Sequence, residues 1–101
     1  MSRERLNAAE LAQRLTGLAG WVQEEEGSKW IVKSYRFPAF MDGIAFVGEA
    51  ARLSEAANHH PMIAIDYKKV TLRLTTWSAG GLTELDLELA ARFDEAYASY
   101  R

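Results

Sequence analysis

The sequence predicts an α+β protein in which a layer of helices packs against one four-stranded antiparallel sheet. Helical and strand-like periodicities alternate along the chain in the order α-β-β-α-β-β-α. Each pair of consecutive strand-like segments is joined by a short turn, which indicates two hairpins. The 101 residues are 49% apolar and 26% charged and contain no repeat or linker, so we expect one globular domain over 1–101.

The first third of the chain has the pattern of a helix followed by a hairpin. Asn7 and Glu10 are spaced as a capping box, and leucines then recur on one helical face until Gly20. Strands are expected over 21–25 and 29–37, on either side of the turn EEGS.

A longer helix is expected over 40–58. Pro38 suits a first helical turn, and apolar residues form two stripes along the segment that follows. Gly43 and Gly48 each cost about 1 kcal/mol relative to alanine inside a helix. We therefore expect something to pack closely against this helix, either the sheet or a second subunit.

The second hairpin and a last helix complete the chain. Alternating residues predict strands over 62–67 and 70–77, and Thr83 with Asp86 forms a second capping box before the last helix. Trp77 falls on the polar side of its strand. It either covers the edge of the core or an oligomer interface, or it offers a flat surface to a planar ligand.

Charge and composition argue against several classes of function. Twelve basic and fourteen acidic residues give a net charge of -2, so no overall positive field would gather nucleic acid or anionic lipid. Without cysteine there is no disulfide, thiolate metal site or thiol nucleophile. The start MSRERLNAAE has no apolar signal segment, and no stretch reaches the ~20 apolar residues of a membrane span, so we expect a cytoplasmic protein. A core this small also favours self-association.

The chain has two histidines, His59 and His60, which are adjacent and precede Pro61. Pro61 favours an extended His60, whereas His59 is expected at the frayed end of the long helix, one turn after Glu55. Glu55 is then placed to orient the His59 imidazole, as expected for an acid/base group. The alternative is that His59 only complements the helix dipole and that Asp86 is only a capping carboxylate. Diverging histidines in a chain without cysteine do not predict a metal site.

A longer spacing pattern joins these residues. It runs from a carboxylate through three residues to HHP, then five residues to an aromatic, nine to a tryptophan and eight to an aspartate, at Glu55, His59, His60, Pro61, Tyr67, Trp77 and Asp86. This pattern resembles that of the pterin-4a-carbinolamine dehydratase family, also called 4a-hydroxytetrahydrobiopterin dehydratases. Trp21 and the segments FPAF and GGLTELD are similar to the family as well, so the resemblance covers nearly the whole chain.

The resemblance implies a hydro-lyase that removes water from 4a-hydroxytetrahydropterin to give quinonoid dihydropterin, in tetrahydrobiopterin recycling after an aromatic amino acid hydroxylase. It implies helices on one face of the sheet, a homodimer or homotetramer, and no metal or bound cofactor. His59 and His60 would be the acid/base pair, assisted by Glu55, because imidazoles suit both proton transfers at neutral pH. The substrate-binding residues would be Asn58, Pro61, Tyr67, Thr75, Thr76, Trp77, Ser78 and Asp86.

One position departs from many members of the family. They carry a third histidine where this chain has Trp77, whose indole donates a hydrogen bond but has no nitrogen that titrates near pH 7. Trp77 is therefore not expected to transfer a proton. The alternative function is a non-catalytic module, because relatives of this fold serve as a dimerisation cofactor for a transcription factor and as a RuBisCO assembly factor. The intact Glu55 and histidine pair favour the enzyme.

Overall fold

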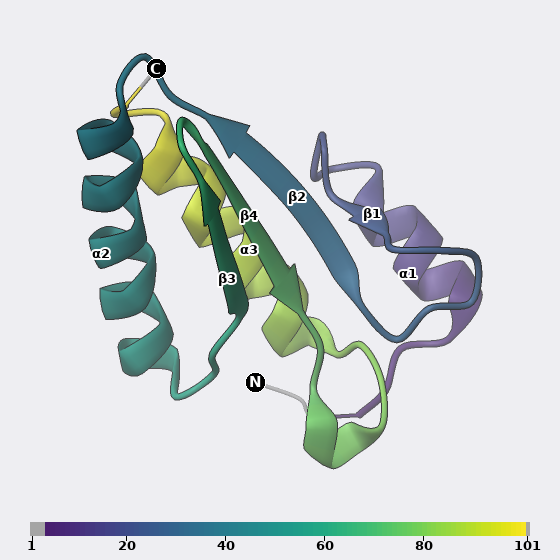
Figure 1. Cartoon of the computed structure of the whole chain (residues 1–101). Helices are drawn as coiled ribbons and strands as arrows, with labels where there is room; N and C mark the ends of the chain where they lie inside the picture. The colour runs from purple at the N-terminus through teal and green to yellow at the C-terminus, as the bar shows by residue number, and fades with distance from the viewer. Residues whose placement is uncertain (1–3, 101) are drawn as a thin grey trace.

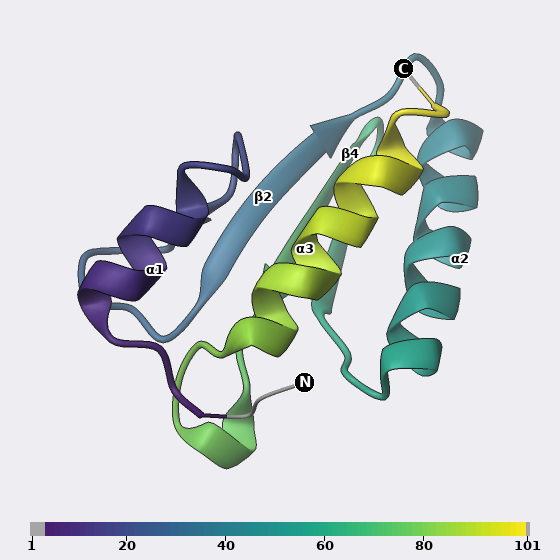
Figure 2. The same ribbon diagram turned by 180° about the vertical axis from the view of Figure 1, so that it is seen from behind.

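Four strands pair antiparallel in the order β1-β2-β4-β3, and three helices lie on one face of the sheet (Figures 1 and 2). The computed structural model describes residues 4–100. In chain order the elements are α1 (Ala8–Leu15), β1 (Val22–Gln23), β2 (Ile31–Arg36), α2 (Phe40–Ala57), β3 (Met62–Asp66), β4 (Lys69–Leu74), the short 3₁₀ helix η1 (Trp77–Ala79) and α3 (Glu84–Tyr97). The predicted fold class and element order are confirmed.

The two predicted capping boxes begin their helices. In α1, Asn7 and Glu10 exchange side-chain and backbone hydrogen bonds, and in α3, Thr83 and Asp86 do the same. All four orphan N–H groups at a helix start need partners, so a local side chain that supplies one fixes where the helix begins. The sequence therefore predicts a helix start well when that start depends on a capping box between residues three apart.

α2 departs from its prediction at its first residues. It begins two residues after Pro38, so the expectation that this proline occupies the first helical turn is wrong. Gly43 packs against the sheet, since an added Cβ would lie 3.3 Å from the Phe37 ring and 3.4 Å from Val70. The expected close packing is therefore present at Gly43, but at Gly48 the same position is open and nothing in the structure explains that glycine.

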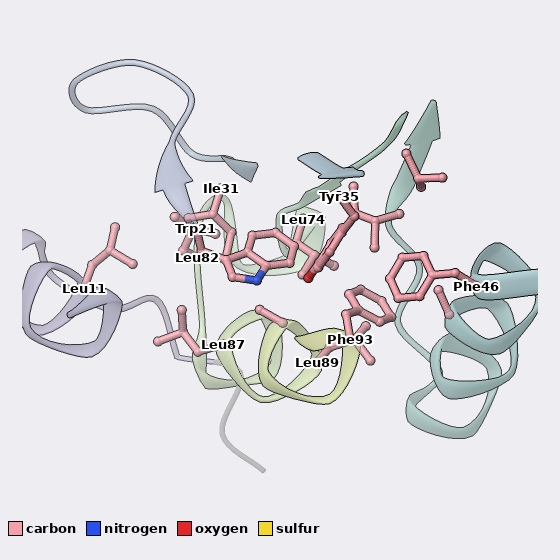
Figure 3. Close-up of a cluster of buried hydrophobic side chains, with 14 of the residues drawn as sticks. Leu11, Trp21, Ile31, Tyr35, Phe46, Leu74, Leu82, Leu87, Leu89 and Phe93 are labelled. Carbon is pink, nitrogen blue, oxygen red and sulfur yellow. The ribbon is translucent and has the colours of Figure 1, made fainter. Parts of the chain in front are cut away.

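The core lies between the sheet and the helices, with α3 running along it (Figure 3). In β4 the side chains of Val70, Leu72 and Leu74 are fully buried on the helix side. Thr71 and Arg73 alternate with them and point to the face that carries no helix. This two-sided strand continues directly into the segment that forms the candidate site.

A second carboxylate of α3, Asp94, gathers three donors within the edge of the core, a group that we call the Asp94 cluster. Its Oδ1 accepts hydrogen bonds from the Trp21 indole at 3.1 Å, the Lys33 ammonium at 2.9 Å and the Tyr35 hydroxyl at 2.5 Å. Burial, and then the Asp94 carboxylate, raise the pKa of the Tyr35 hydroxyl above its ordinary value. The cluster joins α3 to β2 and to the loop before β1.

The outer edge of the sheet at β3 is exposed along its whole length. Met62, Ile63 and Ile65 leave 53%, 39% and 45% of their surfaces in solvent. An edge strand with large exposed apolar side chains and unpaired backbone groups is a surface on which another strand can pair. No helix within residues 4–100 is both long enough and apolar enough to cross a membrane.

Candidate functional site

A cavity of about 380 Å³ opens where the end of α2 meets the segment after β4. Its lining residues are Asn58, His59, His60, Thr75, Thr76, Trp77 and Ser78. All seven are among the residues singled out from the sequence, although they come from two segments about fifteen residues apart in the chain. The fold thus brings both histidines to the same cavity as the Thr75–Ser78 segment.

The end of α2 sets the direction of both histidines. Asn58 adopts the left-handed conformation, with φ 49°, and the backbone N–H of His59 then donates to the carbonyl of Ser54. This reversal is a common way to satisfy the last carbonyls of a helix, and asparagine tolerates it better than most residues. The expectation that His59 continues the helix is therefore wrong, because the chain has already turned away at Asn58.

His59 is buried, and its Nε2 lies 2.6 Å from Oδ1 of Asp86. Asp86 is fully buried, and its Oδ2 accepts from the Thr76 hydroxyl at 2.7 Å and from the backbone N–H of Thr83 at 2.9 Å. We call these four residues the Asp86 cluster. The carboxylate caps α3, as the sequence indicated, and it also holds the imidazole from 27 residues away.

The Asp86 cluster fixes the tautomer of the His59 ring. An ionised carboxylate only accepts hydrogen bonds, so Nε2 must carry a proton and Nδ1 is the nitrogen left to act as a base. Within residues 4–100, no fully buried side-chain nitrogen or oxygen lacks a partner, so Nδ1, for which no bond is found, is not fully buried, and His59 is one of the residues that line the cavity. A nitrogen presented in this way is available to a ligand in the cavity.

His60 has a different carboxylate partner. Its Nε2 lies 2.5 Å from Oε2 of Glu55, and both side chains are exposed. The expectation that Glu55 orients His59 is therefore wrong: Glu55 pairs with His60, and Asp86 pairs with His59. The physical reason is the left-handed turn at Asn58, which replaces the helical geometry that would have placed His59 one turn above Glu55.

The other wall of the cavity is not a strand. β4 ends at Leu74, and Trp77 lies in η1 with 78% of its surface exposed, so the prediction of a strand to Trp77 is wrong. The chain closes this loop through a bridge between Thr76 and Gly81, while the Thr75 hydroxyl donates to the carbonyl of Lys29. Trp77 therefore stands on a short anchored loop rather than at the end of a strand.

Three residues beside Trp77 were not among the predicted site residues. The Trp30 ring meets the Trp77 ring edge to face, with centroids 5.2 Å apart. The Arg73 guanidinium lies over the Trp30 ring, 4.5 Å from its centroid, and pairs with the Glu24 carboxylate. The sequence carries one signal for this group. Trp30 falls on the polar side of the strand predicted over 29–37, and Arg73 falls on the polar side of the strand predicted over 70–77.

Four predicted residues do not line the cavity: Glu55 and Asp86, which pair with the histidines, and Tyr67 and Pro61. Tyr67 is at the turn between β3 and β4, where it is exposed and has φ 53°. Pro61 separates His60 from β3 and does not line the cavity. Among the described residues, no three histidine or acidic side chains converge as a metal site would require.

Comparisons with known proteins place this chain in a family. Residues 4–96 match the family model described as pterin 4 alpha carbinolamine dehydratase. A protein of Roseiflexus sp. (strain RS-1), named "Putative pterin-4-alpha-carbinolamine dehydratase", is 50% identical over 91 residues, which cover 90% of this chain and 95% of the relative. A protein of Sinorhizobium medicae (strain WSM419) with the same name is 44% identical over 96 residues, which cover 95% of this chain and 90% of the relative.

Two solved structures share the fold. A transcriptional coactivator/pterin dehydratase from Brucella melitensis superposes with a TM-score of 0.88 at 32% identity, covering 93% of this chain and 99% of that one. A pterin dehydratase-like protein described as a RuBisCO assembly factor in the alpha-carboxysome has a TM-score of 0.65 at 25% identity, covering 77% of this chain and 89% of that one. Because the family model matches most of the chain and a relative is 50% identical, this chain belongs to the pterin-4α-carbinolamine dehydratase family.

Proposed function

We propose that this chain dehydrates 4a-hydroxytetrahydropterin to quinonoid dihydropterin. The observation that carries the proposal is the pair of imidazoles at one cavity, each held by its own carboxylate, His59 by Asp86 and His60 by Glu55. Two separately held imidazoles can address two different edges of one bicyclic ring. A module that only bound a protein partner would not need either pair.

The reaction needs two proton transfers. The C4a–O bond breaks as the departing hydroxyl takes a proton and leaves as water. The N5 proton goes to a base, and the N5–H electron pair becomes the second bond between N5 and C4a. One imidazole donates the first proton and the other accepts the second, which suits a side-chain type that changes its protonation near neutral pH. Trp77 takes no part in these transfers, because an indole only donates a hydrogen bond.

The remaining lining residues supply binding. Asn58, Thr75, Thr76 and Ser78 offer amide and hydroxyl groups at the cavity, and such groups orient a pterin through its many ring donors and acceptors. After a two-electron reduction by a separate reductase, the product would return to the tetrahydropterin pool that an aromatic amino acid hydroxylase uses, in the cytoplasm. Residues 1–101 would act as one domain in this role.

We also propose that the protein is a homo-oligomer in which β3 pairs with β3 of a second copy. Support comes from the exposed edge and its apolar side chains, which begin two residues after His60. Replacing Ile65 with lysine should give a monomer by light scattering, because a charge would have to be buried in the interface. Val22→Lys is the matched control, since Val22 is 55% exposed on the opposite edge strand. An unchanged oligomer in Ile65→Lys would contradict this surface.

Stopped-flow dehydration of chemically generated 4a-hydroxytetrahydropterin tests the function. The reaction also proceeds unaided, so each trace is compared with a no-enzyme control. We expect the wild type to accelerate it, with His59→Ala and His60→Ala each reducing the acceleration. The control variant Glu49→Gln, at a half-buried residue that does not line the cavity, should leave it unchanged. Failure of the wild type to exceed the spontaneous rate would instead favour a non-catalytic assembly module.

A further inference from the structure

The cavity has a wall that the acid/base chemistry does not use. Trp77 lines it, yet 78% of its surface is exposed, which is unusual for the largest apolar side chain. An indole left in water on a loop would rotate freely unless something held it. The structure supplies a support in the neighbouring side chains.

Trp30 is the direct support. Its ring meets that of Trp77 at an interplanar angle of 82° with centroids 5.2 Å apart, the edge-to-face arrangement that aromatic pairs prefer. This contact restrains the Trp77 indole. Trp30 itself sits just before β2, whose pairing with β4 fixes the backbone beneath it.

Trp30 is held in turn by Arg73. The Arg73 guanidinium lies 4.5 Å from the Trp30 ring centroid, within the range of a cation–π contact. Arg73 is oriented by a two-bond pair with Glu24, at 2.5 Å from Nε to Oε2 and 2.8 Å from Nη2 to Oε1. A planar fork held by two parallel bonds has little freedom to rotate, so the guanidinium gives Trp30 a fixed surface.

We propose that Trp77 is the stacking wall for the flat ring system of the pterin and that Trp30, held by Arg73, fixes its orientation. This inference rests on the proposed function, because it names the ligand of the same cavity. Trp30, Arg73 and Glu24 are positioning residues: they touch Trp77 directly or through one another and line no part of the cavity. The wall acts on ligand affinity, whereas the histidines act on the proton transfers.

The test measures binding and turnover in matched variants. Calorimetry with 7,8-dihydrobiopterin gives Kd, and stopped-flow dehydration gives kcat and KM. We expect Trp30→Ala to raise Kd and KM about three- to tenfold while kcat stays within about twofold, the range that loss of one aromatic contact gives. Trp30→Phe should restore most of the affinity, because it keeps a ring against Trp77.

Removing the charge of Glu24 tests the contribution of its ion pair with Arg73. Glu24→Gln keeps the shape but removes the ion pair with Arg73, and we expect Kd to rise about twofold. Glu49→Gln is the control, because Glu49 also pairs with an arginine, Arg52, and both residues lie within α2, outside the group formed by Trp77, Trp30, Arg73 and Glu24. That variant should bind as the wild type does.

A spectroscopic readout tests the ring geometry without any ligand. Two indoles in edge-to-face contact couple their transitions and give a paired circular dichroism signal in the far-ultraviolet indole band. The same signal should vanish in both Trp30→Phe and Trp77→Phe and persist in Glu49→Gln. A signal that survives in either Phe variant would overturn the wall.

The outcomes also separate this inference from the proposed function. Binding and acceleration by the wild type with unchanged affinity in a folded Trp30→Ala variant would overturn the wall and leave the dehydratase standing. The wall would also be contradicted if kcat fell as much as the affinity in Trp30→Ala. It would likewise be contradicted if light scattering showed that this variant changes the oligomeric state while its affinity stays unchanged. Wild-type protein that neither binds dihydrobiopterin nor accelerates dehydration would overturn both.

Discussion

Two carboxylates of α3, Asp86 and Asp94, each gather three donors, yet only one of the two clusters faces a cavity. The Asp94 cluster draws on an indole, an ammonium and a phenol from β2 and the loop before β1. The Asp86 cluster draws on a hydroxyl, a backbone N–H and the His59 imidazole. The same device of a carboxylate with several donors therefore serves packing at one end of the helix and presents an acid/base group at the other.

The difference lies in the donors and in what they face. None of the Asp94 donors lines the cavity, so protonation there can only affect the fold. His59 lines the cavity, and histidine is the side-chain type that changes charge between pH 5 and 8 without perturbation. A satisfied buried carboxylate thus indicates a functional site only when one of its donors is an acid/base side chain that also lines a cavity.

The largest effect is expected from replacing the imidazole donor of the Asp86 cluster, His59. His59→Gln keeps an N–H for Asp86 but removes the base, so we expect the enzymatic dehydration rate to fall about 10²- to 10⁴-fold. Lys33→Gln makes the matched change in the Asp94 cluster and should leave the rate within about twofold of the wild type. Stopped-flow traces of both variants, checked for folding by circular dichroism, make the comparison. Equal losses of rate would mean that the two clusters do not differ in kind.

Neutralising the carboxylates should cost stability in both clusters. Asp86→Asn and Asp94→Asn each weaken hydrogen bonds to a charged acceptor. We expect each variant to lower the free energy of unfolding by about 1–3 kcal/mol. Asp86 is fully buried, whereas the Asp94 side chain keeps 27% of its surface exposed, so the Asp86 variant should lose more. Urea denaturation of the two variants beside the wild type measures this. If Asp86→Asn lost less free energy of unfolding than Asp94→Asn, the expectation that greater burial makes the Asp86 carboxylate more important to stability would be contradicted.

Whether a contact in these two clusters could be predicted from the sequence depends on how far apart its residues lie along the chain. The capping role of Asp86 could be predicted because Thr83 lies three residues away and the geometry of a helix start is local. Its bond to His59 could not, because it joins residues 27 apart whose approach depends on how α2 and α3 pack. The resemblance to the family selected both residues, but it gave Glu55 as the carboxylate that assists His59, whereas the structure pairs His59 with Asp86.

The partner of Glu55 was predicted wrongly for a local reason. Helical spacing places His59 above Glu55, but Asn58 adopts a left-handed conformation that no periodicity reveals. Trp77 was assigned to the strand by alternation, which holds up to Leu74 and says nothing about where pairing stops. Trp30 was not among the predicted site residues, because its contact with Trp77 joins two segments that lie far apart in the chain.

A smaller effect separates the clusters at high pH. The pKa of Tyr35 is raised in the folded state, so the folded protein binds this proton more tightly than the unfolded chain. Its contribution to stability is complete below the ordinary tyrosine pKa of about 10 and is lost as pH rises above it, by up to about 1.4 kcal/mol per pH unit. In Tyr35→Phe the free energy of unfolding should fall less steeply over this range.

Tyr67→Phe is the control for that titration, because Tyr67 is exposed at a turn. Its stability should follow the wild type at every pH. Urea denaturation between neutral pH and the alkaline range gives the slopes. If Tyr35→Phe and the wild type lose stability in parallel, the Asp94 cluster does not hold the Tyr35 proton as the structure indicates.

The most direct test of the account measures the enzymatic dehydration rate of Asp86→Asn and Asp94→Asn against the wild type and the spontaneous reaction. An amide at residue 86 can donate to Nε2 and so stabilise the other tautomer of His59, which removes the base from Nδ1. We expect the Asp86→Asn rate to fall at least about tenfold and the Asp94→Asn rate to stay within about twofold of the wild type. A wild-type rate no higher than the spontaneous one, or equal rates for the two variants, would contradict the claim that the Asp86 cluster prepares His59 for catalysis.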